Sequence, residues 1–264
     1  MQALKNVGDI STTTFQLQYI HDQFTTSENF DDISRHCPHV LSIFLDTPDS
    51  AVLPKLQQFK KLKKLKFNKV TFELLLETLK TIPYHISQIE LVTSQGSLDL
   101  SLLSQLCPNL QTLEVYYSKN ILSKGPVQFN KLRKCIIYST ELTGQASSDL
   151  LASCPNIEHL NLSSAKTIDH THLMKIVLDG QLVHVTELAI MSAPMLDIHA
   201  VDLLVTSLPR LRLLGRLQGW NVTASQVEER RKTFKKQNYD ILLWFNLPMH
   251  LELNFDEGLD DIME

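Results

Sequence analysis

The fold is decided by the stretch Cys154-Pro155-Asn156-Ile157-Glu158-His159-Leu160-Asn161-Leu162. Its apolar residues are Cys154, Ile157, Leu160 and Leu162, and polar residues fill the gaps between them. The apolar spacing is three residues at the start and becomes strict alternation over Leu160 and Leu162. Such a change of period indicates a chain that leaves a helix and enters a short strand.

The same apolar pattern recurs along most of the chain. The second apolar position of each copy is, in order, Val40, Leu62, Ile86, Leu110, Leu132, Ile157, Val185 and Leu211. Further apolar residues follow three and five positions later, except in the last copy, where Arg216 takes the final place. Neighbouring copies lie 22 to 28 residues apart, within the range of roughly 20–29 residues that leucine-rich repeats have. The spacing therefore predicts an array of eight such repeats.

The copies resemble leucine-rich repeats of the cysteine-containing, ribonuclease-inhibitor-like kind. The resemblance depends on the Cys-Pro-Asn openings at Cys107 and Cys154 and on the Ile168-Asp169 pair ahead of a second helix. The repeat array is similar to the repeat domain of F-box/leucine-rich-repeat proteins, which are the substrate receptors of cullin-type ubiquitin ligases. We see no F-box-like helical segment ahead of the repeats. For residues 33–216 the resemblance implies a curved α/β solenoid, with parallel strands on its concave face and helices or irregular returns on its convex face.

The chain is expected to comprise four segments. Residues 33–216 hold the eight repeats, and residues 1–32 form a partial or divergent first repeat with its strand at 15–17. Two interpretations of residues 1–32 stay open, a divergent cap or a piece of a longer array. Residues 217–250 are expected to form a C-terminal cap of one helix and one strand. Residues 251–264 form an acidic tail that we expect to be disordered.

Helices are expected in five of the returns, at 72–79, 98–106, 147–153, 171–178 and 198–207. Asp169 is a candidate cap for the fourth. The return between residues 116 and 129 contains Gly125-Pro126 and is expected to be irregular. In the cap, Ser225 and Glu228 fit a capping box at the start of a helix, and 239–245 is expected as a strand.

Charge and composition narrow the classes of function. The 264-residue chain has a net charge of −4, which argues against a general affinity for nucleic acid or membranes. No run approaches the roughly 20 apolar residues of a membrane span. Two of the cysteines that share a repeat position, Cys107 and Cys154, would lie about 10 Å apart, too far for a disulfide. We therefore expect buried thiols and a reducing compartment, the cytoplasm or the nucleus.

No residue pattern points to catalysis. The cluster Asp169-His170-Thr171-His172 looks like part of a metal site, but ligands packed into four residues rarely converge on one ion. No G-x-S-x-G, H-E-x-x-H or P-loop pattern occurs in the sequence. We therefore expect a protein that is not an enzyme, with no catalytic residue, no metal and no cofactor.

A concave binding face is predicted from the strand residues that alternate with the leucines. Its candidate partner-binding residues are Phe44, Lys64, Lys66, Glu90, Glu114, Tyr116, Ile136, Tyr138, His159 and Met191. Phe44, Tyr116, Ile136 and Tyr138 are expected to be exposed, and aromatic residues are common interface anchors. The sequence therefore predicts a protein–protein interaction module, and the resemblance implies substrate recognition for a ubiquitin ligase.

A second hypothesis comes from the lysine-rich stretch 59–69, which contains six lysines. These lysines fill the slots between register residues, where any polar residue is expected, so a plain solvated face explains them. Lys64 and Lys66 could instead form a patch for an acidic partner. The alternative function is RNA binding through this second repeat, and its affinity would fall steeply with salt.

Overall fold

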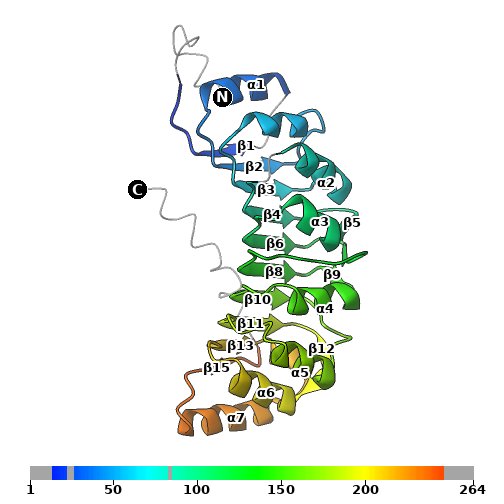
Figure 1. The fold of residues 1–264 in the computed structure, drawn as a ribbon, viewed down its shortest axis with the longest axis vertical. Coiled ribbons are helices and arrows are strands. Elements are labelled where there is room, and N and C mark those ends of the chain that lie inside the picture. The colour runs from blue at the N-terminus through cyan, green and yellow to red at the C-terminus, as the bar shows by residue number, and fades with distance from the viewer. Residues whose placement is uncertain (1–13, 23–26, 83–84, 247–264) are drawn as a thin grey trace.

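The computed structural model describes residues 14–22, 27–82 and 85–246. Its described strands form one long parallel sheet of ten, in the order β1-β2-β3-β4-β6-β8-β10-β11-β13-β15. Figure 1 shows these strands stacked along the molecule, with the sheet on the inner side of a gentle arc and the helices on the outer side. The predicted α/β solenoid, with parallel strands on its concave face and helices on its convex face, is confirmed.

The sheet repeats in step with the sequence period. Its strands are β1 (Tyr19–Asp22), β2 (Ser42–Asp46), β3 (Lys64–Asn68), β4 (Gln88–Val92), β6 (Thr112–Tyr116), β8 (Lys134–Tyr138), β10 (His159–Leu162), β11 (Glu187–Ile190), β13 (Leu213–Gly215) and β15 (Leu242–Leu243). Equivalent repeat positions pair with one another, so Leu65 of β3 lies beside Ile43 of β2 and Ile89 of β4. Side chains one period apart in sequence are therefore neighbours in space.

Helices occupy most of the returns. They are α1 (Ser27–His36), α2 (Phe72–Thr81), α3 (Leu100–Leu106), α4 (Gly144–Ala152), α5 (His170–Leu178), α6 (Ile198–Ser207) and α7 (Ala224–Lys236), with short 3₁₀ helices η3 (Leu53–Gln58) and η4 (Leu217–Gly219). The five helices that the sequence predicts in the returns are confirmed, with ends shifted by a few residues. Asp169 caps α5 as predicted, because its side chain accepts a hydrogen bond from the backbone N–H of His172 at 2.9 Å.

The convex side also holds two small parallel sheets that the sequence analysis does not predict. One consists of β5 (Ser97–Asp99), β7 (Asn120–Leu122) and β9 (Glu141–Leu142), and the other of β12 (Ala193–Asp197) and β14 (Trp220–Asn221). Except for β12, each of these strands has only two or three residues, too few to show an alternating pattern of its own. Pairing across neighbouring repeats satisfies their backbone groups, so they form only in the stack.

Three local predictions need correction, two in position and one in length. The first strand is β1, not residues 15–17, because the Phe15 N–H donates to the carbonyl of His36 at the end of α1 at 2.7 Å. The capping box of α7 is Thr223 with Gln226, because the helix begins two residues earlier than expected. The final strand is only Leu242–Leu243, and the Tyr239 N–H is bonded to the carbonyl of Phe234 in α7. The acidic tail and residues 1–13 lie outside the described residues.

The core fills the space between the sheet and the convex returns. Inward side chains such as Leu65, Phe67 and Leu113 are fully buried and belong to one continuous apolar cluster. Cys107 and Cys154 lie in the same cluster as free thiols, as small buried apolar side chains should. Burial raises the pKa of each of these two thiols to about 12. Both thiols are therefore protonated at neutral pH, which makes them weak nucleophiles.

Candidate partner-binding face

The concave face is built from the strand residues that point away from the core. In β3, β4 and β6 half-buried residues alternate with buried ones, which separates outward from inward side chains. The outward residues form rows across the strands because the register is in step. One row runs through Phe44, Lys66, Glu90, Glu114, Ile136, Asn161 and Ala189, and a second through Lys64, Gln88, Thr112, Lys134, His159 and Glu187. The predicted strand residues therefore share one face.

Most charged residues on this face are already paired with one another. Lys66 Nζ lies 2.6 Å from Glu90 Oε1, and Lys134 Nζ lies 2.8 Å from Glu114 Oε1. The Tyr116 hydroxyl donates to the second carboxylate oxygen of Glu114 at 2.8 Å. The two ion pairs join side chains on neighbouring strands that lie 24 and 20 residues apart in the sequence, whereas Tyr116 and Glu114 belong to the same strand. A partner therefore meets charges that are held in place, which lowers the entropy cost of binding.

Phe44 lies at the N-terminal end of the face and is partly covered. Its ring centre is 4.4 Å from that of His21 on β1, and the Lys66 ammonium lies 5.3 Å from the ring centre. That geometry is a cation–π contact. Lys64, in the neighbouring row, has no ion pair to any described carboxylate. Phe44 therefore belongs to the sheet surface, while Lys64 is available to an acidic group.

Ile136 is not exposed, and that prediction is wrong. Its side chain is only 3% exposed, although it lies in the outward row between Glu114 and Asn161. It also stands apart from the apolar cluster of the core. Neighbouring strands are about 4.8 Å apart, so the larger side chains beside a medium-sized one can cover it on a concave surface. Ile136 supports the floor of the face and offers little area to a partner.

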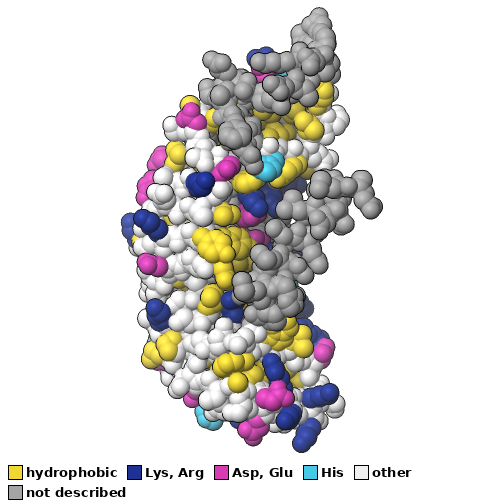
Figure 2. Space-filling view, turned by 180° about the vertical axis from the view of Figure 1, so that it is seen from behind, with side chains coloured by type: hydrophobic (Ala, Val, Ile, Leu, Met, Phe, Trp, Pro, Cys, Tyr) yellow, Lys and Arg dark blue, Asp and Glu magenta, His cyan; other side chains and the backbone are white. Residues whose placement is uncertain are grey.

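Among the described residues, the most exposed aromatic ring is one that the sequence analysis missed. Tyr117 is 59% exposed, and its ring packs edge-on against Tyr138 with centres 5.6 Å apart. It follows the last residue of β6 in the left-handed conformation, with φ at 50°. Figure 2 shows hydrophobic side chains gathered on the surface at the level of β6 and β8. The two tyrosines thus form an aromatic ledge at the strand ends.

The conformation of Tyr117 belongs to a repeated turn. Residues in the left-handed region follow the strands β2, β3, β4, β6 and β8, namely Thr47, Lys69, Thr93, Tyr117 and Ser139. The Tyr117 N–H donates to the carbonyl of Tyr138 at 3.0 Å, and the equivalent bond of Thr93 goes to Tyr116. The sequence signal for this turn is its position, immediately after each five-residue strand, and not the residue type. The turn extends the ladder of main-chain hydrogen bonds beyond the strand. It therefore fixes the backbone position from which the Tyr117 side chain projects.

Arg216 is the second residue that was missed. It replaces the last apolar residue of its repeat, yet it is only 2% exposed. Its backbone φ is 62°, so Arg216 does not follow the alternation that makes the equivalent residues of other repeats point inward. Its guanidinium carbon lies 5.1 Å from the centre of the Tyr138 ring. The small residues Gly215 and Ala189 pair in the sheet beside it. An arginine at an apolar register position was the sequence signal for this contact.

The remaining predicted residues lie toward the C-terminal half of the face. His159 Nδ1 is 3.2 Å from the Glu187 carboxylate on the next strand. The hydrogen bond from His159 is the main cause that lowers the pKa of Glu187 below its usual range. Met191 follows β11 and is half-buried, and its N–H donates to the carbonyl of Leu162 at 2.9 Å. The face therefore ends in a histidine–carboxylate pair and a methionine.

The Asp169-His172 cluster caps helix α5. The Asp169 carboxylate oxygen that caps α5 also lies 2.8 Å from His172 Nδ1. Within the described ranges, no three His, Cys, Asp or Glu side chains gather as metal ligands would. Those ranges also contain no helix with the length and apolar character needed to cross a membrane.

Comparisons with known proteins add little to this description. No protein-family model matches the chain, and neither does any curated protein. Among solved structures, the chain is similar to one chain of a yeast structure described as the complex of Rad7 and Elc1. The identity is 11% and the TM-score 0.37, over 88% of this chain and 81% of that chain. A likeness at this level carries no inference about function.

Proposed function

We propose that the chain binds a partner protein on its concave face and catalyses no reaction. The observation that carries the proposal is the aromatic ledge, in which an exposed Tyr117 is held by the ring of Tyr138. Tyrosine is among the residues that supply most of the binding energy in protein interfaces. A ring that is already fixed by an edge contact loses little side-chain freedom when a partner covers it.

The surroundings of the ledge favour a partner of mixed character. Beside it lie the ion pairs of Glu114 and Lys134 and of Lys66 and Glu90, whose side chains are mostly buried. Protein interfaces combine an apolar centre with a polar rim of paired groups. Lys64 adds one cation without a described carboxylate partner. We therefore expect the partner to place an apolar or aromatic group on Tyr117 and an acidic group near Lys64.

A narrower proposal is that the partner is a substrate of a ubiquitin ligase. Its support is the resemblance of the Cys-Pro-Asn repeats at Cys107 and Cys154 to those of F-box/leucine-rich-repeat proteins. The ligase subunits would then have to be recruited through a different part of the assembly. Cullin or adaptor subunits that co-purify with the full chain would support this narrower proposal, and their absence would remove it while leaving partner binding intact.

The test compares two matched alanine variants. Tyr117→Ala alters the concave ledge, and Leu178→Ala alters an apolar side chain on α5 that is 77% exposed on the convex side. Proteins captured from extracts of the source cells by the full chain are quantified by mass spectrometry for wild type and both variants. We expect one protein to be depleted at least tenfold with Tyr117→Ala and kept with Leu178→Ala, at unchanged melting temperature. Equal capture by both variants would refute the concave site.

A further inference from the structure

The edge of the sheet where the strands begin is basic. Two positions in each repeat lie on this edge, one and three residues before the strand. In the eight repeats they hold His39, Leu41, Lys61, Lys63, His85, Ser87, Asn109, Gln111, Lys131, Arg133, Asn156, Glu158, His184, Thr186, Arg210 and Arg212. Six of the chain's 25 Lys and Arg residues occupy these positions, but only one of its 29 Asp and Glu residues does. We call the six Lys and Arg with the three His residues the basic edge.

Few carboxylates neutralise this edge. Arg133 lies 3.7 Å from Glu158, and Arg212 lies 3.3 Å from the highly exposed Asp240. Lys61, Lys63 and Arg210 make no ion pair with a described carboxylate. The Lys61 ammonium instead donates to the ring nitrogen of His39 at 2.8 Å. A lysine that is bonded to a second basic side chain indicates that no carboxylate of the described residues is within reach.

The surroundings of His85 show the same excess of positive charge. Burial, followed by the nearby Lys63 and Lys60 ammonium groups, lowers the pKa of His85. Its Nε2 is buried without a hydrogen-bond partner among the described residues. The first half of the edge therefore has a positive potential that its own side chains do not cancel.

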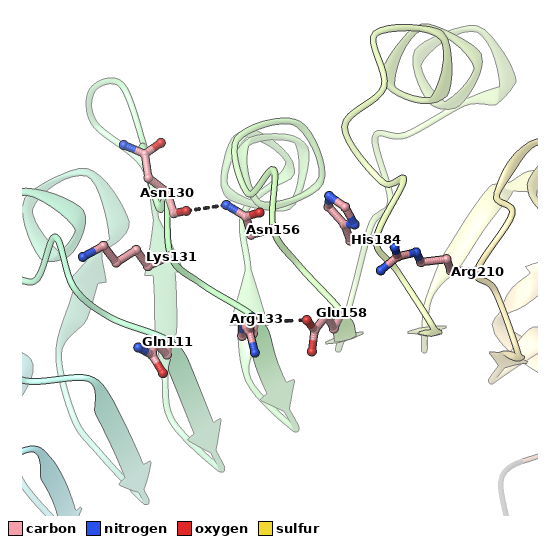
Figure 3. A pocket seen from close by; sticks show the side chains of 8 residues that line it. All are labelled: Gln111, Asn130, Lys131, Arg133, Asn156, Glu158, His184 and Arg210. Atoms are coloured by element: carbon pink, nitrogen blue, oxygen red, sulfur yellow. Dashed lines mark hydrogen bonds and ion pairs between the residues drawn. The ribbon is translucent and has the colours of Figure 1, made fainter.

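The second half of the edge encloses an open polar hollow of about 610 Å³. Its lining comprises Gln111, Asn130, Lys131, Arg133, Asn156, Glu158, His184 and Arg210. In Figure 3 the Arg210 side chain extends toward His184, while Lys131 and Arg133 come from the loop before β8. Lys131 is held by Asn109 at 2.6 Å, and Asn156 donates to the carbonyl of Asn130 at 2.7 Å. Ordered amides and cations of this kind suit oxyanions.

From these observations we propose that the basic edge binds the phosphate backbone of a nucleic acid without reading its bases. The edge extends from β2 to β13, roughly 34 Å at about 4.8 Å per strand. A single small anion cannot bridge its two halves, whereas a polymer of phosphates can. None of the sixteen edge positions holds Phe, Tyr or Trp, so the edge has neither the aromatic anchors common in protein interfaces nor the Phe, Tyr or Trp rings on which bases stack. Lysine and arginine contacts to phosphate need neither.

The basic edge is a different surface from the concave face. It also differs from the lysine-rich stretch 59–69, because the lysines of that stretch are divided between the two surfaces. Lys64 and Lys66 lie on the concave sheet surface, whereas Lys61 and Lys63 lie on the edge. The net charge of −4 hides the edge because 28 of the 29 Asp and Glu residues occupy other sequence positions. The inference stands independently of the proposed protein partner, since the two sites share no residue.

The experiment measures binding of the full chain to a fluorescent 20-nucleotide oligouridylate at several salt concentrations. Six phosphate contacts predict that log K falls with log salt with a slope of about −4 for a single strand. The triple variant Lys61→Gln, Lys63→Gln and Arg210→Gln should reduce this slope by about 2 and the affinity at least tenfold. Oligothymidylate and a mixed-sequence strand should bind equally, because no base or 2′-hydroxyl is read.

The matched control removes the same charge elsewhere. Lys119→Gln, Lys166→Gln and Lys175→Gln change three exposed lysines outside the edge positions, and this variant should bind like wild type. No binding at 50 mM salt, or equal weakening by both triple variants, would overturn the proposal. Polyglutamate that competes as well as oligouridylate at equal charge would also overturn it, because an acidic protein segment would then be the better ligand.

Discussion

The contact between Arg216 and Tyr138 can be tested by a double-mutant cycle. The changes are Arg216→Met, Tyr138→Leu and the combination of both. The guanidinium carbon lies 5.1 Å from the centre of the tyrosine ring, and Arg216 is only 2% exposed. Cation–π contacts contribute about 0.5–1 kcal/mol at exposed sites and about 2 kcal/mol when they are desolvated. Because Arg216 is buried and Tyr138 is half-buried, we expect a coupling free energy between about 1 and 2 kcal/mol.

The cycle is needed because single substitutions mix several effects. Arg216 has a left-handed backbone with φ at 62°, which is strained for any residue other than glycine. Methionine keeps this strain and most of the apolar stem, so the strain cancels when the four proteins are compared. The free energy of unfolding is measured by urea titration for wild type, both single variants and the double variant. A coupling of about 1.4 kcal/mol corresponds to a factor of ten in the folding equilibrium, and it is obtained from the shifts of the urea midpoint at a common slope.

A second cycle supplies the control. Arg216→Met combined with Leu178→Ala joins a residue of the concave face to an exposed one on the convex helix α5. Distant substitutions add within about 0.5 kcal/mol, so this cycle should show no coupling. A coupling below about 0.5 kcal/mol for Arg216 and Tyr138 would refute the argument that the arginine fixes the aromatic ledge. The fixed position of the Tyr117 ring, which packs against Tyr138, would then need another explanation.

Two further predictions concern backbone geometry and pH. Gly219→Ala should lower the free energy of unfolding by about 3 kcal/mol or more, because its Cβ would lie 1.5 Å from the carbonyl oxygen of Met191. The control Gly125→Ala, whose Cβ would come no closer than 3.6 Å to Ser101, should be neutral or stabilising by at most about 1 kcal/mol in the same urea titration. Burial tends to raise the pKa of Asp99, but hydrogen bonds from Ser101 and backbone N–H groups outweigh it and lower the pKa below 3.8. The stability that ionised Asp99 gives is therefore present above pH 3.8 and lost as pH falls through its lowered pKa, so wild type should lose more stability than Asp99→Asn between about pH 6 and pH 3. Equal losses in the two proteins would show that Asp99 does not titrate as its capping of α3 requires.

The repeat spacing was sufficient to predict the sheet and most of its helices. Each repeat places an apolar residue three positions after its second apolar position, and all but the last place another five positions after it. Burial of these residues forces one strand per period. Leu113 and Val115 are therefore inward and Glu114 outward whatever surrounds them. Helix caps such as Asp169 are equally local, because the side chain bonds to an N–H three residues away. Local periodicity thus determines which residues belong to the core and which to the concave face.

What each outward residue does was decided only by the neighbouring repeats. Ile136 is buried although it lies in the outward row, and Glu114 and Arg216 contact Lys134 and Tyr138, which belong to other repeats. The basic edge has the same origin, because its cations come from separate repeats and meet only when the strands stack. Exposure and pairing depend on the sizes and charges of side chains about 4.8 Å away across the sheet. A sequence pattern specifies the row in which a side chain lies, and the stacked structure decides what that side chain contacts.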